Sequence, residues 1–447
     1  MKGKGKGAEP QTGRVVSLTS DAEGVVRDGK AAFVTGALPG ELVVYQRLTQ
    51  HKSHDEARLL EVLEPSPARV APRCRHYTLC GGCAMQHVAP EEQLRLKDDE
   101  LRQALLRVGQ VEPHTWLPPL HGAAWGYRRR ARLGARYVTA KQRSLVGFRE
   151  RHSSYVAELE GCEVLVPRVG ALLPALSALV SQLSIRMRMP QIEVAAADNQ
   201  LALVLRTLLP LTAEDRTLLA AFEREHDVRL YLQAGSPDQL ETLDGQDSPL
   251  WYELPQFDVR LQFRPSDFVQ VNGPMNQLLV ARVIELLQLD AQSTVLDLFC
   301  GLGNFTLPLA RRSAQVVGIE GEAGLVQRAR DNAAANGLAN TRFEVANLAG
   351  PTAAAQCLAL AGKPGSFSHV LLDPPRTGAR DILPTVAQLA PRRVVYVSCH
   401  PGSLARDLGI LVRDHGFTLR AAGIADMFAQ TTHVESIAVL DGPGASS

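Results

Sequence analysis

Short apolar runs, amphipathic stretches and a regular alternation of strands with helices follow one another along the chain. From about residue 13 to residue 64, brief β-branched runs such as Glu41–Tyr45 and Ala57–Val62 are separated by turn signals such as Asp28-Gly29. Five such runs in about fifty residues predict an OB-type β-barrel, with an SH3-like barrel as the alternative. The sequence Pro65-Ser66-Pro67 then predicts a boundary.

The middle of the chain mixes helical and strand periodicity. Apolar positions recur at helical spacing from Glu91 to Val108, and Gly109 is expected to end that helix. Farther on, the pattern predicts a helix at Val169–Leu183 and strands at Gln191–Ala195 and Leu201–Arg206. These elements indicate an α+β region without an internal repeat.

The last third alternates between strand-like apolar runs and amphipathic helices. Such alternation predicts an α/β fold with a parallel, doubly wound, Rossmann-like sheet and helices on both of its faces. The predicted helices are Asn276–Leu287, Glu322–Asn336 and Ser403–His415. The predicted strands are Thr294–Phe299, Gln315–Glu320, Thr341–Val345, His369–Asp373 and Arg393–Ser398, followed by final strands that reach Leu440.

The length of 447 residues and the hydrophobic content of 45% are those of a globular protein with several domains. We expect a disordered basic arm at residues 1–10, the barrel at 11–65, a central α+β domain at 66–265 and the doubly wound domain at 266–447. No apolar run approaches the roughly 20 residues of a membrane span, and the Lys/Gly-rich start lacks a signal peptide's apolar core. We therefore expect a cytoplasmic protein with no membrane partner, and no obligate protein partner is indicated.

Positive charge is concentrated in one segment, although the net charge is only +1. Between Leu120 and His152 the sequence has nine Lys and Arg residues and one acidic residue, Glu150. A solvated charged face is the default interpretation of such a run. Aromatic residues such as Tyr127 and Phe148 lie among the charges, which is the composition of an RNA-binding surface.

Three cysteines lie close together at Cys74, Cys80 and Cys83, and Cys162 follows farther along the chain. In a reducing compartment such a cluster indicates a metal centre rather than disulfides. Four thiolates suit either zinc or a [4Fe–4S] cluster, and the spacing does not distinguish the two. The alternative is that these cysteines hold no metal.

Several polar residues are expected at the carboxyl edge of the predicted sheet, where ligands bind in open α/β folds. The loop Asp297–Phe305 contains two glycines that allow close approach to a nucleoside, and it lacks the third glycine of a pyrophosphate site. Glu320 ends the next strand, where an acid can accept hydrogen bonds from ribose hydroxyls. Asn347 follows the third strand and is either an adenine contact or a turn residue.

Two further strands contribute chemistry at the same edge. The prolines after Asp373 stiffen the loop that presents this acid. Cys399 follows the strand Arg393–Ser398 and is either a nucleophile or a small residue that fills the strand end. Glu435 interrupts an apolar strand and is either a surface-facing residue or a general base.

These motifs together resemble a known family. The loop Asp297–Phe305, Glu320 and the Asp-Pro-Pro-Arg sequence that begins at Asp373 resemble S-adenosylmethionine-dependent methyltransferases. With Val397-Ser398-Cys399 followed by Pro401, and with His433–Ser436, the chain is similar to RNA (uracil-C5)-methyltransferases. The barrel resembles a TRAM domain through the turn Leu38–Glu41, and the four cysteines are similar to the [4Fe–4S] ligands of that family. The combination resembles the branch that methylates uracil 1939 of 23S ribosomal RNA.

The resemblance covers essentially the whole chain and implies a role for individual residues. Cys399 would be the nucleophile that adds to carbon 6 of a flipped-out uracil, and Glu435 the base that removes the proton from carbon 5. Cys74, Cys80, Cys83 and Cys162 would be the cluster ligands. His400 departs from the family pattern, in which we expect Asn after the nucleophile. Cofactor or substrate contacts are implied for Gln270, Phe299, Asn304, Glu320, Asn347 and Asp373.

Three other functions remain as alternatives. A transfer-RNA uracil methyltransferase needs neither the barrel nor the cysteine cluster. A non-catalytic iron–sulfur protein that binds RNA or acts as a sensor would not need a complete set of catalytic positions. A dinucleotide oxidoreductase is disfavoured because the third glycine of its fingerprint is absent.

Overall fold

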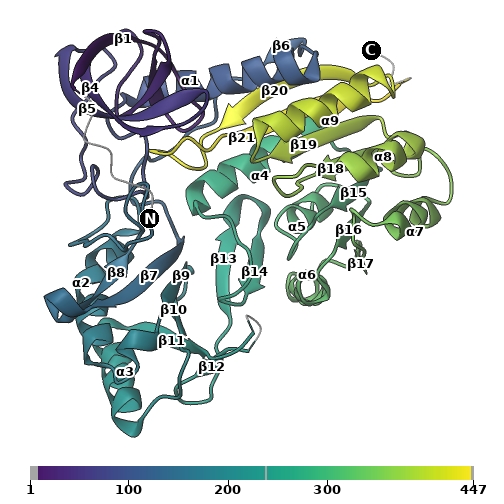
Figure 1. Cartoon of the computed structure of the whole chain (residues 1–447). Helices are drawn as coiled ribbons and strands as arrows, with labels where there is room; N and C mark the ends of the chain where they lie inside the picture. Colours follow the sequence, from purple (N-terminus) through teal and green to yellow (C-terminus); the bar gives the residue numbers. More distant parts are fainter. Residues whose placement is uncertain (1–8, 237–238, 444–447) are drawn as a thin grey trace. The chain divides into compact units, whose positions relative to one another are not determined.

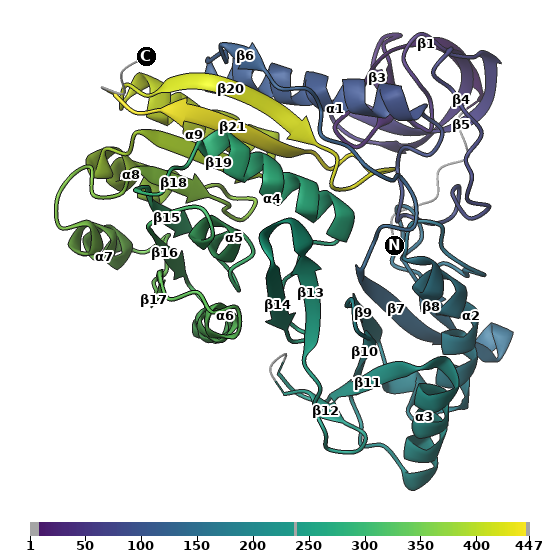
Figure 2. The same cartoon turned by 180° about the vertical axis from the view of Figure 1, so that it is seen from behind.

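The computed structural model describes residues 9–236 and 239–443, and the basic arm expected at residues 1–10 lies mostly outside this range. Figure 1 shows the chain and Figure 2 shows it from behind. The chain divides into two compact units, which are described separately. One contains the chain up to Glu100 together with Arg149–Ser154 and Phe428–Thr432. The other contains Leu101–Phe148, Tyr155–Met427 and the chain from His433.

The first unit contains a closed five-stranded barrel, so the barrel prediction is confirmed. Its strands follow the order β1-β2-β3-β5-β4 around the barrel. Alternate residues such as Val15, Val34 and Val43 are almost fully buried inside it, as the period of a half-buried strand requires. The strands are β1 Gln11–Leu18, β2 Glu23–Val26, β3 Ala31–Thr35, β4 Leu42–Gln50 and β5 His54–Glu64.

One helix continues from the first unit into the second. Helix α1 spans Pro90–Ala104 and ends in a π-helical turn at Leu105–Gly109. The prediction of a helix that Gly109 ends is therefore confirmed, with a wider last turn. A Cβ atom on Gly109 would lie 2.7 Å from the carbonyl oxygen of Ala405, so only glycine allows this close packing against the helix that contains Ala405.

The second unit begins with an α+β half built on a six-stranded sheet of order β12-β11-β10-β9-β7-β8. The basic segment forms the hairpin β7–β8 at one edge of this sheet. Its strands are β7 Arg130–Val138, β8 Arg143–Gly147, β9 Gln191–Ala196, β10 Leu201–Arg206, β11 Val228–Gln233 and β12 Glu241–Thr242. Helices α2 Pro167–Gln182 and α3 Ala213–His226 accompany it, and β13 Leu250–Leu254 pairs with β14 Val259–Phe263 in a separate hairpin.

The rest of the second unit is an α/β fold with an eight-stranded sheet of order β17-β16-β15-β18-β19-β21-β20-β6. The first five strands in this order are parallel. The doubly wound prediction is confirmed, with one correction: β21 runs antiparallel to both of its neighbours because a short connection joins it to β20. The strands are β15 Thr294–Leu298, β16 Gln315–Glu320, β17 Thr341–Val345, β18 His369–Leu372, β19 Arg393–Ser398, β20 Thr418–Ala425 and β21 Glu435–Asp441.

Helices cover both faces of this sheet. Helix α9 lies in front of the strands in Figure 1 and behind them in Figure 2, whereas α4 lies on the opposite face. Buried side chains of α7, α8 and α9 form one continuous core with the strands. The helices are α4 Gly273–Leu287, α5 Thr306–Ala310, α6 Ala323–Ala335, α7 Pro351–Ala361, α8 Leu383–Leu389 and α9 Pro401–Arg413.

A two-residue strand, β6 Thr115–Trp116, completes the edge of the eight-stranded sheet by pairing with β20. The sequence analysis missed β6, and it also missed α7. None of the helices among residues 9–236 and 239–443 combines the length and the apolar character that a membrane span requires.

Candidate active site

Strand register brings Cys399 and Glu435 to the same level of the sheet. Ser398 at the end of β19 pairs with Ser436 in β21, so the residues on either side of this pair, Cys399 and Glu435, are neighbours across the two strands. The reversed direction of β21 places its first residue, rather than its last, at the carboxyl edge of the parallel strands. Glu435 therefore begins this strand instead of interrupting it, and it is only 4% exposed rather than surface-facing.

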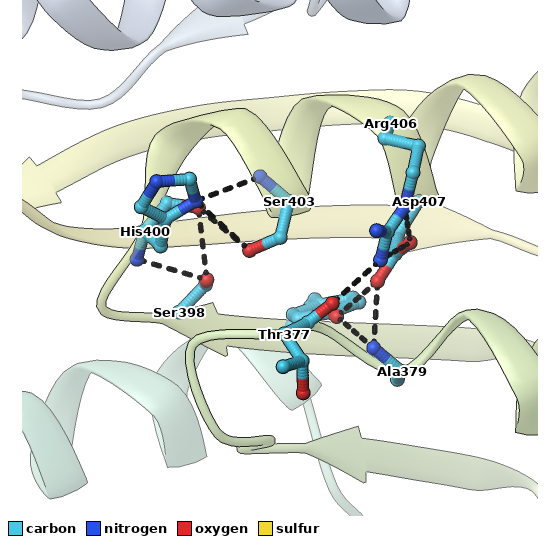
Figure 3. Close-up of polar contacts among 8 residues, drawn as sticks. Thr377, Ala379, Ser398, His400, Ser403, Arg406 and Asp407 are labelled. Atoms are coloured by element: carbon cyan, nitrogen blue, oxygen red, sulfur yellow. Dashed lines mark hydrogen bonds and ion pairs between the residues drawn. The ribbon is translucent and has the colours of Figure 1, made fainter. Parts of the chain in front are cut away.

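The side chains of Ser398 and Ser403 form hydrogen bonds with the main chain of His400, the residue that follows Cys399 (Figure 3). The buried Ser398 hydroxyl accepts a hydrogen bond from the His400 N–H at 3.2 Å and lies 3.3 Å from the His400 carbonyl oxygen, to which it donates. The Ser403 hydroxyl donates to the same carbonyl at 3.1 Å. Cys399, which is half-buried, is thus the middle residue of a hydrogen-bonded loop.

The structure explains why His can stand at position 400, where the resemblance leads us to expect Asn. His400 is the N-cap of α9, and its Nδ1 accepts a hydrogen bond from the main-chain N–H of Ser403 at 3.1 Å. An Asn side-chain oxygen makes the same bond at helix N-termini, because the first N–H groups of a helix lack partners within it. Pro401 follows at the first helical position, where its missing N–H costs nothing. His400 therefore serves as the cap, a role that the expected Asn could also fill.

Helix α9 also holds the loop that follows Asp373. The fully buried Asp407 carboxylate accepts hydrogen bonds from the Ala379 N–H at 2.7 Å and from the Tyr396 hydroxyl at 2.6 Å. Arg406 forms an ion pair with Asp407 and donates to the Thr377 carbonyl at 2.8 Å (Figure 3). The sequence analysis missed this network, since a Tyr inside a strand and an Asp inside a helix carry no local signal for it.

Burial raises the pKa values of three acids and a thiol at this edge. Burial raises the pKa of Asp373 to about 7. It also raises the pKa of Asp297 to about 7, with further increases from the charges of Asp373 and Glu320, although a hydrogen bond from Thr306 opposes the shift. The pKa of Glu435 lies well above its usual value because of burial and the charge of Asp373.

The Cys399 thiol is protonated at neutral pH in this environment. Burial raises its pKa to about 11, and the negative charges of Glu435 and Asp373 add to the shift, whereas Arg376 lowers it. A thiol activated by a cation would show the opposite shift. Cys399 can therefore react as a thiolate only when a proton acceptor is close or the local charge balance changes.

The loop after β15 has an unusual backbone conformation. Phe299 has a φ of 67°, and Gly303 has a φ of 99° with space for a Cβ blocked by Leu307 at 2.4 Å. Glu320 accepts hydrogen bonds from the N–H of Gly301 at 3.2 Å and of Gly321 at 2.6 Å. The half-buried Glu320 thereby holds the glycine loop at the carboxyl edge of β15 and β16.

Asn304 is engaged within the protein. Its amide pairs reciprocally with the amide of Asn276 at 2.8 and 2.9 Å, and its oxygen also accepts from the Tyr252 hydroxyl at 2.9 Å. Gln270 lines a small hollow together with Asn276 and Tyr252. Asn276 and Tyr252 were not among the predicted site residues, and no local pattern marks either of them.

Asn347 lies exposed after β17 and forms a turn. Its side-chain oxygen accepts a hydrogen bond from the N–H of Ala349 at 3.2 Å. The turn alternative considered for this residue thus describes its contacts in the structure. Its expected contact with a cofactor stays a prediction.

The cysteine-rich loop of the first unit is ordered by contacts within that unit. The Gly82 N–H donates to the sulfur of Cys80 at 3.4 Å, and Arg151 donates to the Cys83 carbonyl at 2.6 Å. Cys74, Cys80 and Cys83 are half-buried, as is Cys162 in the second unit. In the described part of the chain, no three His, Cys, Asp or Glu side chains are gathered so that they could hold a metal ion.

Most cations of the basic segment already have partners inside the protein. Arg132 pairs with Glu193, and Lys141 and Arg143 both pair with Glu158. Arg130 donates to the Pro265 carbonyl, and burial lowers its pKa. Arg132, Lys141 and Arg143 are exposed although they are paired, and Arg136 and Arg149 are also exposed. The segment therefore offers less uncompensated charge than its composition indicates.

Comparisons with known proteins identify the family of the chain. The family described as tRNA (Uracil-5-)-methyltransferase matches residues 91–442. A 23S rRNA (uracil(1939)-C(5))-methyltransferase RlmD of Nitrosococcus oceani is 49% identical over 97% of this chain and 96% of its own. The protein of the same name from Stenotrophomonas maltophilia is 46% identical over 96% of both chains.

A solved structure shares the fold over nearly the whole chain. The tRNA (uracil-54, C5)-methyltransferase of Pyrococcus abyssi, in complex with S-adenosyl-L-homocysteine, superposes with a TM-score of 0.74. It covers 96% of this chain and 100% of that one, at 22% sequence identity. The family match and the close relatives together show that the chain belongs to the RNA uracil-C5 methyltransferases, the tRNA (uracil-5-)-methyltransferase family.

Proposed function

We propose that this protein, acting in the cytoplasm, transfers a methyl group from S-adenosylmethionine to carbon 5 of uracil 1939 in 23S ribosomal RNA. One structural observation carries the proposal: a thiol and a buried acid, Cys399 and Glu435, lie side by side on adjacent strands. The relatives that are 46% to 49% identical and named for this uracil support the choice of substrate.

The nucleophile has the first task. Carbon 5 of uracil is a poor nucleophile, and addition of the Cys399 sulfur at carbon 6 converts the ring to an enolate that reacts at carbon 5. The thiol proton leaves to solvent and the bond from sulfur to carbon 6 forms. The double bond between carbons 5 and 6 shifts to carbons 4 and 5, and the negative charge moves to the oxygen on carbon 4. The hydrogen-bonded loop around Cys399 fixes the direction of attack.

Glu435 has the second task. After carbon 5 is methylated, its proton must leave before the Cys399 sulfur can be expelled and the ring double bond restored. A buried acid whose pKa is raised well above its usual value is, once ionised, a stronger proton acceptor than an exposed one. The position of Glu435 next to Cys399 would allow it to reach the same ring.

S-adenosylmethionine, when bound, would supply an electrophilic methyl group, and its positive charge would favour the ionised forms of the nearby acids and the thiol. We propose that the cofactor and the target uracil are held by the loop after β15 and by the ends of β16, β17 and β18. The conformations of Phe299 and Gly303 and the hydrogen bonds of Glu320 support this site. The proposed contacts are Gln270, Phe299, Asn304, Glu320, Asn347 and Asp373.

We further propose that Cys74, Cys80, Cys83 and Cys162 hold a [4Fe–4S] cluster. Four thiols are the donor set that such a cluster requires, and the hydrogen bond from Gly82 to the Cys80 sulfur is of the kind that stabilises a thiolate ligand. The three thiols of the loop are not gathered about one point among the described residues, so the proposal stands on the donor chemistry. Methyl transfer needs no electron, and the cluster would therefore order the protein or orient the RNA.

The RNA must present its uracil outside the base stack. Flipping the base costs a few kcal/mol, and the cost is lowest in single-stranded or looped RNA. We propose that the domain at residues 11–65, as a TRAM-type barrel, and the basic hairpin β7–β8 provide contacts to this RNA. The central domain at 66–265 and the catalytic domain at 266–447 complete the proposed organisation.

The substrate is tested by mapping methylated uridines in ribosomal RNA from cells with and without the gene. We expect 5-methyluridine at position 1939 of 23S RNA to disappear in the deletion strain and to return with the intact gene. Transfer RNA from the same cells is the comparison. Loss of 5-methyluridine in transfer RNA, with position 1939 unchanged, would contradict the proposal and favour a transfer-RNA enzyme.

The roles of Cys399 and Glu435 are tested by single substitutions. We expect Cys399→Ala to bind S-adenosylmethionine as the wild type does and to lose methyl transfer, because the sulfur takes part only in the reaction with RNA. Isothermal titration and transfer of labelled methyl to RNA measure the two properties. Methylation by this variant at the wild-type rate would overturn the mechanism.

Glu435→Gln should stop the reaction at a later stage. Without a base, the methylated ring keeps its proton and stays bonded to Cys399, so a covalent protein–RNA adduct should accumulate. A denaturing gel detects the adduct as a slowly migrating band, and the double variant with Cys399→Ala is the control that should not form it. Normal turnover without an adduct would show that the base lies elsewhere.

A further inference from the structure

The N-cap of α9 and the Cys399 loop are one structural device. His400 is adjacent to Cys399, and its ring accepts the hydrogen bond that begins the helix, at 3.1 Å from the Ser403 nitrogen. The ring lies over Gly402, where a Cβ atom would approach Cε1 to 3.0 Å. The main chain of His400 is in turn bonded to the Ser398 hydroxyl. A change at the ring is therefore transmitted to the main chain that carries Cys399.

The cap depends on the protonation state of the ring. An imidazole nitrogen accepts a hydrogen bond only through a free lone pair, whereas both nitrogens of the imidazolium ion carry hydrogen. The bond to Ser403 thus requires a neutral ring with its hydrogen on Nε2. An Asn cap has no such requirement, because its oxygen accepts at any pH near neutrality.

We propose that His400 is a positioning residue: its neutral ring holds Cys399 in place through the α9 cap, and protonation of the ring releases the loop. The proposal rests on the role of Cys399 as the nucleophile. It implies that activity falls at low pH as the His400 ring becomes protonated. A protein with Asn at the same position would not show this decline.

The surroundings of His400 favour the neutral ring. Burial lowers its pKa, and the two cations that face it, Arg376 from the loop after β18 and Arg406 from α9, lower it further. The adjacent titratable group is the Cys399 thiol, which carries no charge while protonated. A His with a lowered pKa in the folded state stabilises the fold above its unfolded pKa near 6.5, and this stability is lost as the pH falls through the folded value.

The first test is spectroscopic and does not depend on catalysis. Nitrogen chemical shifts of histidine-labelled protein distinguish the two neutral tautomers and the imidazolium ion. We expect the His400 signals, assigned with His400→Asn, to show an unprotonated Nδ1 at pH 7.5 and to titrate below pH 6.5. The opposite tautomer, or a charged ring at pH 7.5, would overturn the proposal.

The second test compares His400→Ala with His400→Asn. Loss of the cap should slow single-turnover methylation by about tenfold in the Ala variant, because a small misplacement of a reacting group is costly. The same variant should alkylate Cys399 with iodoacetamide about threefold faster, because a released thiol is less enclosed and ionises more readily. His400→Asn should keep both rates within about twofold at pH 7.5 and lose the acid-side decline.

Thr212→Ala is the matched control. Thr212 is the N-cap of α3, and its hydroxyl accepts from the Asp215 N–H at 3.1 Å, so this variant also loses a helix cap. It should lose comparable stability without changing the pH profile or the alkylation of Cys399, which peptide mass spectrometry quantifies. Equal effects of Thr212→Ala and His400→Ala would overturn the proposal. If the wild-type protein did not methylate the RNA, the proposed function would be contradicted. The spectra and the alkylation rates would still test whether the His400 cap positions Cys399.

Discussion

At the scale of single residues, the site contains three acids whose pKa values are raised. Asp297 and Asp373 have pKa values of about 7, and Glu435 is shifted in the same direction. Burial is the first cause for all three, and their mutual repulsion adds to it in Asp297 and Glu435. Such a cluster suits a cationic ligand, because a positive charge among the acids favours their ionised forms.

The raised pKa of Asp373 predicts how stability depends on pH. A carboxyl whose folded pKa exceeds its unfolded pKa stabilises the fold fully below the unfolded value, and this contribution is lost as the pH rises through the folded value. We therefore expect Asp373→Asn to have nearly the wild-type stability at pH 4 and to exceed it at pH 8 by more than about 1 kcal/mol. Urea unfolding at the two pH values measures the difference.

Asp244→Asn serves as the control for this prediction. Asp244 has a lowered pKa because Arg229 donates hydrogen bonds to it, so its removal should give no such gain at pH 8. A stability difference between Asp373→Asn and the wild type that does not change with pH would contradict the shift of Asp373.

At the scale of elements, α9 supports two loops of the site at once. Its first turn caps the Cys399 loop through His400 and Ser403, and its second turn holds the Asp373 loop through Arg406 and Asp407. The loops follow adjacent strands, β18 and β19, so one helix sets the spacing between the acid and the thiol.

Tyr396→Phe tests this support. The variant removes the hydroxyl that donates to the buried Asp407 at 2.6 Å and accepts from the Ala379 N–H at 3.0 Å. We expect a loss of about 1 to 3 kcal/mol in unfolding free energy, because a buried carboxylate loses a donor. We also expect slower methyl transfer, because the Asp373 loop loses an anchor.

Tyr231→Phe is the matched comparison, since the Tyr231 hydroxyl donates to Asp247 at 3.0 Å in the α+β half. It should lower stability and leave the rate of methyl transfer unchanged. If Tyr396→Phe and Tyr231→Phe have the same effect on the rate, the α9 network does not position the site.

The sequence predicted the elements whose periodicity is long and regular. The predicted and observed limits of β16, β17 and β19 coincide, and Cys399 directly follows β19 as expected. Helix α7 was missed because its Ala-rich sequence lacks an amphipathic pattern. The reversed β21 could not be foreseen because direction follows from the short connection after β20, and the cap at His400 requires knowledge of where α9 begins.

At the scale of the molecule, the positive charge that is available to bind RNA differs from the number of Lys and Arg residues in the sequence. Arg132 and Arg136 are both exposed on β7, and Arg132 lies 3.1 Å from its ion-pair partner Glu193. We expect Arg136→Ala to weaken RNA binding and to lower the salt dependence of the binding constant by about one unit of slope. Arg132→Ala should have a smaller effect, because its charge is already compensated. Titrations of labelled RNA at several salt concentrations measure both, and equal slopes would contradict the expectation.

The small strand β6 has a consequence for folding during synthesis on the ribosome. Its residues Thr115 and Trp116 pair with Ala421 and Ala422, which are synthesised about 300 residues later. At roughly 5 to 20 residues per second, β6 waits about 15 to 60 s for its partner. Cys399 and Glu435 also emerge in this last interval. The newly made chain therefore lacks the pair Cys399 and Glu435 until its synthesis is nearly complete.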